Sequence, residues 1–236
     1  MSGALLSVEG LEVEFLTRRG TVDAVRGISF DLGPGTAMGL VGESGCGKSV
    51  TAQALMGLVQ VPGRIKAGRV VWKGRDLLDP ANGAYAREVC GRDIAMIFQD
   101  PMTSLDPLFT IGAQIAEVLS HHKGLSGSAA RARAIELLDL VRISEPGRRV
   151  DQYPHEFSGG MRQRALIAMA LASEPDLLVA DEPTTALDVT VQAGILHLLA
   201  ELQGRLGLSV LMIKHDFGVV ARLCQRVAVM YAGEIV

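Results

Sequence analysis

The sequence predicts an α/β fold in which helices cover both faces of a parallel sheet. Nearly continuous apolar runs are typical of strands that are buried on both sides. Such runs occur at residues 37–41, 94–98, 177–180, 210–213 and 227–230. Stretches with apolar residues at helical spacing separate them, and this alternation of strands and helices indicates a doubly wound core.

Two regions depart from this pattern. Residues 11–15 and 22–30 are separated by Arg18-Arg19-Gly20, and residues 70–72 precede Lys73-Gly74, so we expect an antiparallel β layer beside the parallel sheet. The middle of the chain, residues 101–163, has a mostly helical pattern. There we expect Ser128 to cap a helix that continues through Leu137 and Val141.

The composition is that of a globular chain with a sizeable core. The 236 residues are 48% hydrophobic and 21% charged, which suits one α/β domain. The formal charge of −3 provides no net basic field for nucleic acid. The mean hydropathy of +0.28 is high, yet no run approaches the roughly 18 apolar residues that span a membrane. Early acidic residues such as Glu9 and Glu12 disfavour a signal peptide, and three scattered cysteines indicate a reducing cytoplasm.

A glycine-rich segment with the pattern G-x-x-x-x-G-K-[ST] follows the first apolar run. It comprises Gly42, Glu43, Ser44, Gly45, Cys46, Gly47, Lys48 and Ser49, and Val50 continues it into an expected helix over residues 49–58. Glycines let backbone N–H groups converge on phosphate oxygens, and a helix N-terminus adds partial positive charge. We therefore expect Lys48 to reach the β and γ phosphates of ATP and the Ser49 hydroxyl to bind Mg²⁺. The alternative, a plain glycine-rich turn, is disfavoured by the strand and helix that flank it. We interpret Cys46 as a small filler rather than a redox-active thiol.

The apolar run at residues 177–180 ends in two carboxylates. Asp181 is placed to hold Mg²⁺ through water, and Glu182 to act as the general base that polarises the attacking water. Acidic residues often end strands, so this interpretation depends on the phosphate-binding loop.

A third element is the start of a helix expected over residues 161–171. Ser158 is a good N-cap, and Gly159, Gly160 and Met161 follow it. The segment is either an ordinary capped helix or a second phosphate-binding surface. A single site has no use for two such surfaces around one γ-phosphate, whereas two subunits facing head to tail would use one from each.

Taken together, these motifs resemble the nucleotide-binding subunit of ABC transporters over essentially the whole chain. The resemblance implies that residues 157–161 are the signature motif, which binds the ATP of the opposite subunit. It implies that Gln99 contacts Mg²⁺ and water, that Asp188 lies in the dimer-interface loop Ala186-Leu187-Asp188, and that His215 contacts the γ-phosphate. It also implies one nucleotide-binding domain, residues 1–236. Residues 1–100 and 166–236 would then form the P-loop NTPase core with its β layer, and residues 101–165 an inserted helical subdomain.

Residues 99–107 and 153–157 resemble those of the oligopeptide, dipeptide and nickel importers. This resemblance implies a second ABC ATPase subunit, homologous or identical, two integral-membrane permease subunits and an extracytoplasmic solute-binding protein. It places the chain peripherally on the cytoplasmic face of the inner membrane, with no nucleic acid partner. A soluble ABC ATPase of DNA maintenance or translation is the alternative, and the short segment between Lys48 and Ser158, which lacks sustained heptads, argues against it.

The sequence departs from the family pattern at three places. Lys214 stands where the family usually carries Thr. A cation beside His215 would favour the neutral imidazole, and it could also contact phosphate. Arg19 stands where an aromatic residue usually stacks on adenine, with Phe15 nearby. Relatives in this subclass also usually continue beyond Val236, often into a cysteine-bearing tail that can hold an iron–sulfur cluster.

Overall fold

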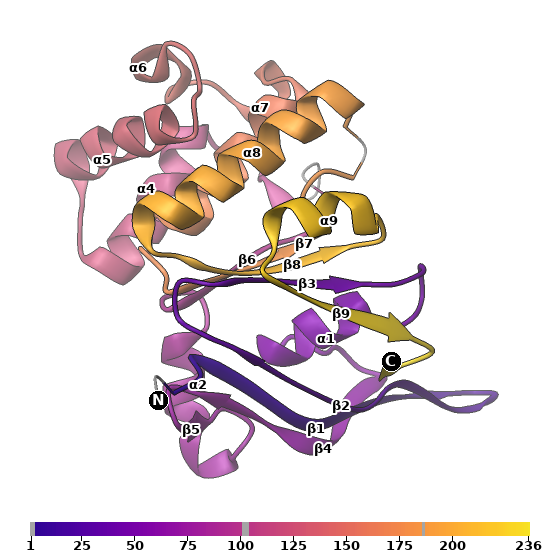
Figure 1. Ribbon diagram of the computed structural model, residues 1–236. Helices are drawn as coiled ribbons and strands as arrows, with labels where there is room; N and C mark the ends of the chain where they lie inside the picture. Colours follow the sequence, from indigo (N-terminus) through magenta and orange to yellow (C-terminus); the bar gives the residue numbers. More distant parts are fainter. Residues whose placement is uncertain (1–2, 101–103, 186) are drawn as a thin grey trace.

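The computed structural model describes residues 3–100, 104–185 and 187–236, and it contains two β-sheets (Figure 1). Helix α1 (Lys48–Leu55) lies between the two sheets. Helices α8 (Val189–Leu206) and α9 (Phe217–Leu223) lie on the opposite face of the larger sheet. Helices therefore cover both faces of the larger sheet, as its apolar runs predicted.

The larger sheet has the strand order β10-β9-β3-β8-β7-β6. Its strands are β3 (Ala37–Val41), β6 (Ile94–Ile97), β7 (Leu177–Asp181), β8 (Ser209–Lys214), β9 (Arg226–Tyr231) and β10 (Glu234–Ile235). The pairings β9-β3, β3-β8, β8-β7 and β7-β6 are parallel, and β10 pairs antiparallel with β9. All five predicted strands are confirmed. The carboxyl ends of β3, β7 and β8 meet at one edge of the sheet, which is where the predicted phosphate loop and carboxylates follow them.

The smaller sheet is entirely antiparallel and confirms the expected β layer. Its order is β2-β1-β4-β5, with β1 (Leu6–Thr17), β2 (Gly20–Leu32), β4 (Gly63–Trp72) and β5 (Arg75–Asp76). Lys73 and Gly74 form the turn between β4 and β5, and both adopt positive φ angles, 47° and 83°. One face of this sheet packs against α1 through buried side chains such as Leu6, Val13 and Trp72.

Helices dominate the middle of the chain, as predicted. They are α2 (Gly83–Val89), α4 (Ile111–Lys123), α5 (Gly127–Leu140), α6 (Pro146–Arg149) and α7 (Gly159–Leu171), with 3₁₀ turns at Pro80–Asn82 and Pro154–Glu156. The prediction that Ser128 caps α5 is wrong. Ser126 occupies the N-cap position, because its carbonyl already accepts the first-turn hydrogen bond from the Ala130 N–H at 3.4 Å.

The boundaries of α1 also differ from the expected range 49–58. The helix begins one residue earlier, at Lys48, and ends at Leu55. It ends there because Gly57 adopts a left-handed conformation with φ 66° and the Leu58 N–H folds back to the Gln53 carbonyl at 2.8 Å.

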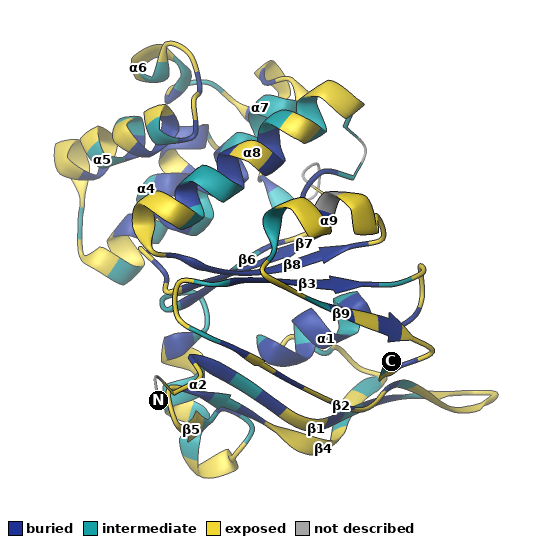
Figure 2. Cartoon of the chain, viewed as in Figure 1, coloured by how far each residue is buried: buried dark blue, intermediate teal, exposed yellow. Residues whose placement is uncertain are grey.

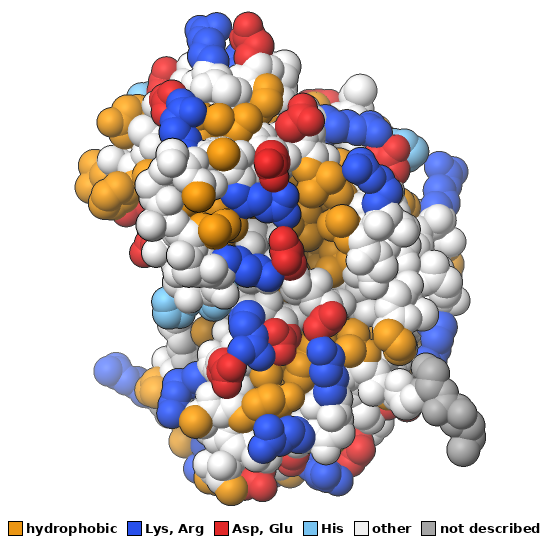
Figure 3. Space-filling model, turned by 90° about the vertical axis from the view of Figure 1, so that its left-hand side faces the viewer, with side chains coloured by type: hydrophobic (Ala, Val, Ile, Leu, Met, Phe, Trp, Pro, Cys, Tyr) orange, Lys and Arg blue, Asp and Glu red, His pale blue; other side chains and the backbone are white. Residues whose placement is uncertain are grey.

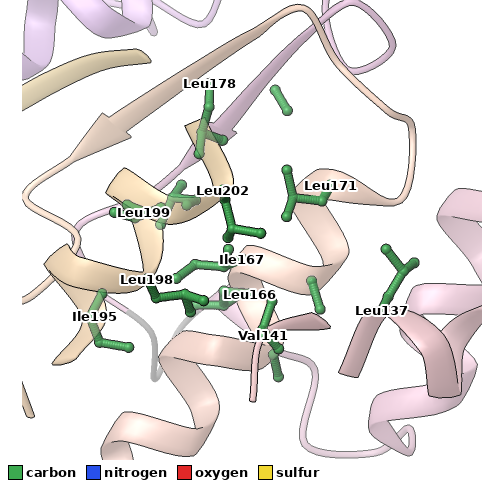
Figure 4. Packing of buried hydrophobic residues seen from close by; sticks show 14 of the residues in the cluster. Leu137, Val141, Leu166, Ile167, Leu171, Leu178, Ile195, Leu198, Leu199 and Leu202 are labelled. Carbon is green, nitrogen blue, oxygen red and sulfur yellow. The ribbon is translucent and has the colours of Figure 1, made fainter. Parts of the chain in front are cut away.

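Buried side chains divide into two clusters, one on each face of the larger sheet (Figure 2). On β8, Leu211 and Ile213 face α1, whereas Val210 and Met212 face the opposite side, as expected for alternating strand residues. Figure 4 shows how the cluster on the face opposite α1 joins the helices to the larger sheet. Its labelled members come from α5, the turn after it, α7, β7 and α8: Leu137, Val141, Leu166, Ile167, Leu171, Leu178, Ile195, Leu198, Leu199 and Leu202. Each fully buried side chain of this size contributes about 1.5–3 kcal/mol.

Candidate functional site

The glycine-rich loop between β3 and α1 is closely packed against neighbouring backbone. A Cβ atom on Gly42 would lie 2.1 Å from the Met230 carbonyl oxygen, and one on Gly47 would lie 2.3 Å from the Ala24 carbonyl oxygen. Gly47 also has φ 105°, a left-handed conformation that favours glycine. The loop therefore requires glycine at both positions, and its shape is fixed by strands β9 and β2.

The ammonium of Lys48 lies inside this loop. Lys48 is 4% exposed, and its Nζ donates hydrogen bonds of 2.8 Å to the carbonyl oxygens of both Gly42 and Glu43. The Cys46 Sγ is 3.7 Å from the same Nζ, and its side chain packs within the core between the two sheets. This packing agrees with the interpretation of Cys46 as a small filler.

Asp181, at the end of β7, meets the first turn of α1. The Ser49 hydroxyl donates a 3.0 Å hydrogen bond to Asp181 Oδ1. Burial raises the pKa of the Asp181 carboxyl. The hydrogen bond from Ser49 and the charge of Lys48 partly offset this rise, whereas the charge of Glu182 adds to it. Two oxygen donors of the kind that Mg²⁺ prefers thus lie together beside the phosphate loop.

Glu182 is held in place by three neighbours. Its N–H donates to the Ile213 carbonyl at 3.0 Å, and its Oε2 accepts a 2.7 Å hydrogen bond from the Thr185 hydroxyl. The Nδ1 atom of His215 lies 3.4 Å from the same Oε2. Glu182 has a φ of 46°, a left-handed conformation that is rare for a residue with a side chain and is typical of functional sites. The Glu182 side chain is nearly buried, whereas that of His215 is 56% exposed.

Two adjoining hollows surround the loop. One, of about 210 Å³, brings Gln99 and Glu182 together with the loop; its lining is Ala24, Ser44, Gly45, Gly47, Lys48, Ser49, Val50, Gln99 and Glu182. The other, of about 470 Å³, is lined by Val41, Gly42, Glu43, Ser44, His215, Phe217 and Val229. The structure thus gathers the predicted loop residues, both carboxylates, Gln99 and His215 at one edge of the larger sheet.

The Ser158 segment and Asp188 form a separate cluster that lines neither hollow. The Ser158 hydroxyl accepts from the Met161 N–H at 3.3 Å and caps α7, and Asp188 accepts from the Val191 N–H at 3.0 Å and caps α8. A Cβ on Gly160 would lie 2.6 Å from Val191 Cγ1, so the two helix starts are packed together. Ala186, and Pro101, Met102 and Thr103 of the subclass segment, lie outside the described residues.

Sequence reasoning missed Thr185 as a contact of Glu182, and it left open whether Lys214 contacts phosphate. The Thr185 hydroxyl, three residues after Glu182, was a usable sequence signal for this contact. Lys214 is 3% exposed and lines neither hollow, so the contact with phosphate that the sequence left open is not supported.

Arg19 lies in the exposed turn between β1 and β2, where its N–H donates to the Thr17 hydroxyl at 3.2 Å. Phe15 packs into the core beside Gly63.

A phosphate-binding loop before a helix, with a strand-end carboxylate pair and a histidine beside it, defines a P-loop ATPase of the ATP-binding cassette class. The model of the family described as ABC transporter matches residues 25–185, and the chain belongs to this family. Its cassette binds and hydrolyses ATP.

Similar proteins agree with this assignment. The chain is 55% identical to the dipeptide transport ATP-binding protein DppD of Bacillus subtilis over 232 residues, which cover 98% of this chain and 69% of that protein. It is also 55% identical to the oligopeptide transport ATP-binding protein OppD of the same organism, covering 98% of this chain and 65% of that protein. The chain thus spans about two thirds of the length of these relatives.

Solved structures show the same fold. The dimeric ATP-binding cassette MJ0796, in a post-hydrolysis state bound to ADP and Pi, superposes with a TM-score of 0.85 at 27% identity, covering 98% of this chain and 96% of that chain. The cassette cbiO1 from Clostridium perfringens, part of the complex cbiONQ, gives a TM-score of 0.81 at 28% identity, covering 99% of this chain and 87% of that chain. In the part of the chain that the structure describes, no helix has the length and apolar character needed to cross a bilayer.

Proposed function

We propose that this chain is the ATP-hydrolysing subunit of a peptide importer. The observation that carries the proposal is the convergence of Lys48, Ser49, Asp181, Glu182 and His215 around the two adjoining hollows of the phosphate loop. The relatives named for dipeptide and oligopeptide transport support the class of cargo.

Ser49, Asp181 and Gln99 are the residues that would hold Mg²⁺. A hydroxyl, a carboxylate and an amide are oxygen donors of the kind this ion accepts, and the first two are 3.0 Å apart. The described residues contain no cluster of three His, Cys, Asp or Glu side chains that could hold a metal ion without a nucleotide. When bound, the ion would neutralise charge on the phosphate oxygens.

Glu182 is the proposed general base. As the oxygen of water bonds to the γ-phosphorus and the bond to the leaving ADP oxygen breaks, the Glu182 carboxylate takes the proton from the water. Thr185 and His215 both contact Oε2, whereas among the described residues none donates a hydrogen bond to Oε1. Oε1 is therefore the oxygen that we assign to the water, and Lys48 and His215 would stabilise charge on the phosphates.

The second half of each ATP site would come from another cassette. Ser158, Gly159 and Gly160 form an N-terminal helix surface that does not line the hollows around Lys48. A head-to-tail dimer would bring this surface of one subunit to the γ-phosphate of the other, with Asp188 at the interface. The dimeric MJ0796 cassette supports this arrangement. The second cassette is either a copy of this chain or a homologue.

Coupling to the membrane would occur beside Gln99. A groove of about 510 Å³ between β6, α4 and α7 is lined mostly by apolar residues such as Met96, Phe98, Val118 and Met169. We assign it to an apolar helix of one of two permease subunits, which would hold the chain peripherally on the cytoplasmic face of the inner membrane and receive peptides from a solute-binding protein. Acidic and basic side chains alternate over the face in Figure 3, an arrangement that does not favour nucleic acid.

Affinity capture from gently solubilised native membranes tests the importer. Capture through a tagged chain should recover two multi-span proteins and a second cassette, and the associated solute-binding protein would identify the cargo. A matched capture through a Phe98→Asp, Met96→Asp variant should lose the multi-span proteins. Recovery of ribosomal or chromosomal proteins without a membrane partner would contradict the proposal and favour the soluble alternative.

A further inference from the structure

The groove between β6, α4 and α7 has a histidine in a lining that is otherwise mostly apolar. Its walls include side chains such as Met96 and Val118, and the polar side chains that line it among the described residues are Ser104 and His122. The Ser104 hydroxyl already donates a hydrogen bond to the Asp100 carbonyl at 2.6 Å. The hydrogen-bonding groups that remain for an occupant are therefore those of His122.

The imidazole of His122 is accessible from the groove. It lies on α4 one turn after Val118, so the two side chains share the face that lines the groove. Among the residues that the structure describes, none forms a hydrogen bond or an ion pair with it, and its ring meets the edge-on ring of His121 at 4.6 Å between centroids. A Cβ atom on Gly91, which also lines the groove, would lie 3.5 Å from His122 Nε2. Because Gly91 has no side chain, it leaves this edge of the imidazole uncovered.

An unpaired imidazole restricts what can fill the groove. His122 is half-buried, and burial first, then the nearby His121, Arg92 and Lys123, lower its pKa, so the ring is neutral near pH 7. A neutral imidazole has one donor nitrogen and one acceptor nitrogen. A helix with a wholly apolar face would displace water from these nitrogens and supply no hydrogen bond in return, which weakens binding. A helix with a polar side chain opposite the ring would avoid this penalty.

We propose that His122 selects the permease helix that occupies the groove, by pairing through Nε2 with one hydrogen-bonding side chain on the apolar face of that helix. The inference rests on the proposed function, because it takes the groove to be the permease site. Selection works by rejection as well as by attraction, since a helix that is apolar throughout leaves His122 unpaired and binds less tightly. His122 lines neither hollow of the phosphate loop, so ATP hydrolysis by the isolated chain should not depend on it.

The test measures the Kd between the chain and the two permease subunits that capture recovers with it, purified and placed in lipid nanodiscs. His122→Leu removes both nitrogens and keeps an apolar wall. His122→Gln keeps a hydrogen-bonding group at the place of Nε2, whereas the shorter His122→Asn reaches only the place of Nδ1. His121→Leu, the same change at the exposed neighbour that does not line the groove, is the matched control. The melting temperature and the ATPase rate of each isolated chain verify that the fold and the phosphate loop are intact.

We expect the Kd to rise roughly tenfold in His122→Leu and His122→Asn, and to stay within about twofold of the parent value in His122→Gln and His121→Leu. Each polar residue of the permease helix is then changed to leucine in turn. The change at the residue that pairs with His122 should weaken binding of the parent chain about as much, and that of His122→Leu very little.

Two results would overturn the inference and leave the proposed function intact. One is a His122→Leu chain that binds the permease subunits with the parent Kd. The other is an equal loss in His122→Gln and His122→Leu, which would assign the effect to the shape of the ring. A parent chain that recovers no multi-span protein would instead contradict the proposed function, and the inference would fall with it.

Discussion

Ser49 and Asp181 are 132 residues apart in sequence, yet the Ser49 hydroxyl donates a 3.0 Å hydrogen bond to Asp181 Oδ1. The contact joins the first turn of α1 to the end of β7 across the mouth of the phosphate loop. It exists because β7 and β3 are separated in the sheet only by β8, so that both end at the same edge. The two proposed Mg²⁺ ligands are thus brought together by the parallel sheet.

Asp181→Asn should raise the melting temperature of the chain while it lowers the rate of ATP hydrolysis. Burial raises the pKa of Asp181 above its unfolded value, so its ionisation destabilises the fold progressively as pH rises above the unfolded pKa. At neutral pH, without Mg²⁺ or ATP, the variant should melt about 2–4 °C higher, while hydrolysis falls at least about a hundredfold. Thermal melting at about pH 7 and about pH 4 checks the sign, because the gain should shrink as the pH falls toward the unfolded pKa of Asp181. A lower melting temperature at neutral pH would contradict the prediction.

Gly47→Ala should damage the phosphate loop far more than Gly45→Ala. Both glycines have positive φ angles, 105° and 82°, so both substitutions carry a backbone penalty of about 1–2 kcal/mol. Only Gly47→Ala also places a Cβ 2.3 Å from the Ala24 carbonyl, whereas Gly45 has no atom within 4 Å of its Cβ position. We expect a further cost of about 1–3 kcal/mol and loss of ATP binding for Gly47→Ala. Urea unfolding and nucleotide titration of the two variants measure the difference, and equal losses would show that the close contact is not decisive.

The sequence predicted the five parallel strands because each is a short apolar run, although only β3, β7 and β8 are buried along their whole length and β9 alternates between buried and exposed residues. It predicted Asp181, Glu182 and the loop because they follow such runs. It placed the start of α5 incorrectly because Ser126 and Ser128 are equally good caps and only the backbone decides between them. Local pattern could not reveal the burial of Lys214 or the Thr185 contact to Glu182. Both depend on how the loops after β7 and β8 fold against each other.

Thr185→Val should lower the rate of hydrolysis without weakening ATP binding. The Thr185 hydroxyl donates to Glu182 Oε2 at 2.7 Å, and valine keeps the shape of the side chain but removes this donor. Without the Thr185 hydroxyl, His215 is the remaining contact that positions the Glu182 carboxylate. We therefore expect kcat to fall roughly tenfold with an unchanged Kd for ATP. Thr185→Ser keeps the hydroxyl and should retain most of the rate. A loss of rate in the serine variant but not in the valine variant would contradict the prediction and assign the effect to packing of the methyl group.

Two inactive variants should restore activity to each other if the sites are shared between subunits. Lys48→Ala removes the cation of the phosphate loop, and Ser158→Arg blocks the N-terminus of α7, so each chain alone should lose nearly all hydrolysis. In a mixed head-to-tail dimer, the intact loop of the Ser158→Arg chain faces the intact Ser158 of the Lys48→Ala chain, which rebuilds one complete site. ATPase activity should therefore rise on mixing and reach at most about half of the parent rate at saturation. If each site were built within one chain, no mixture of these two variants could hydrolyse ATP, because every chain would carry one defect.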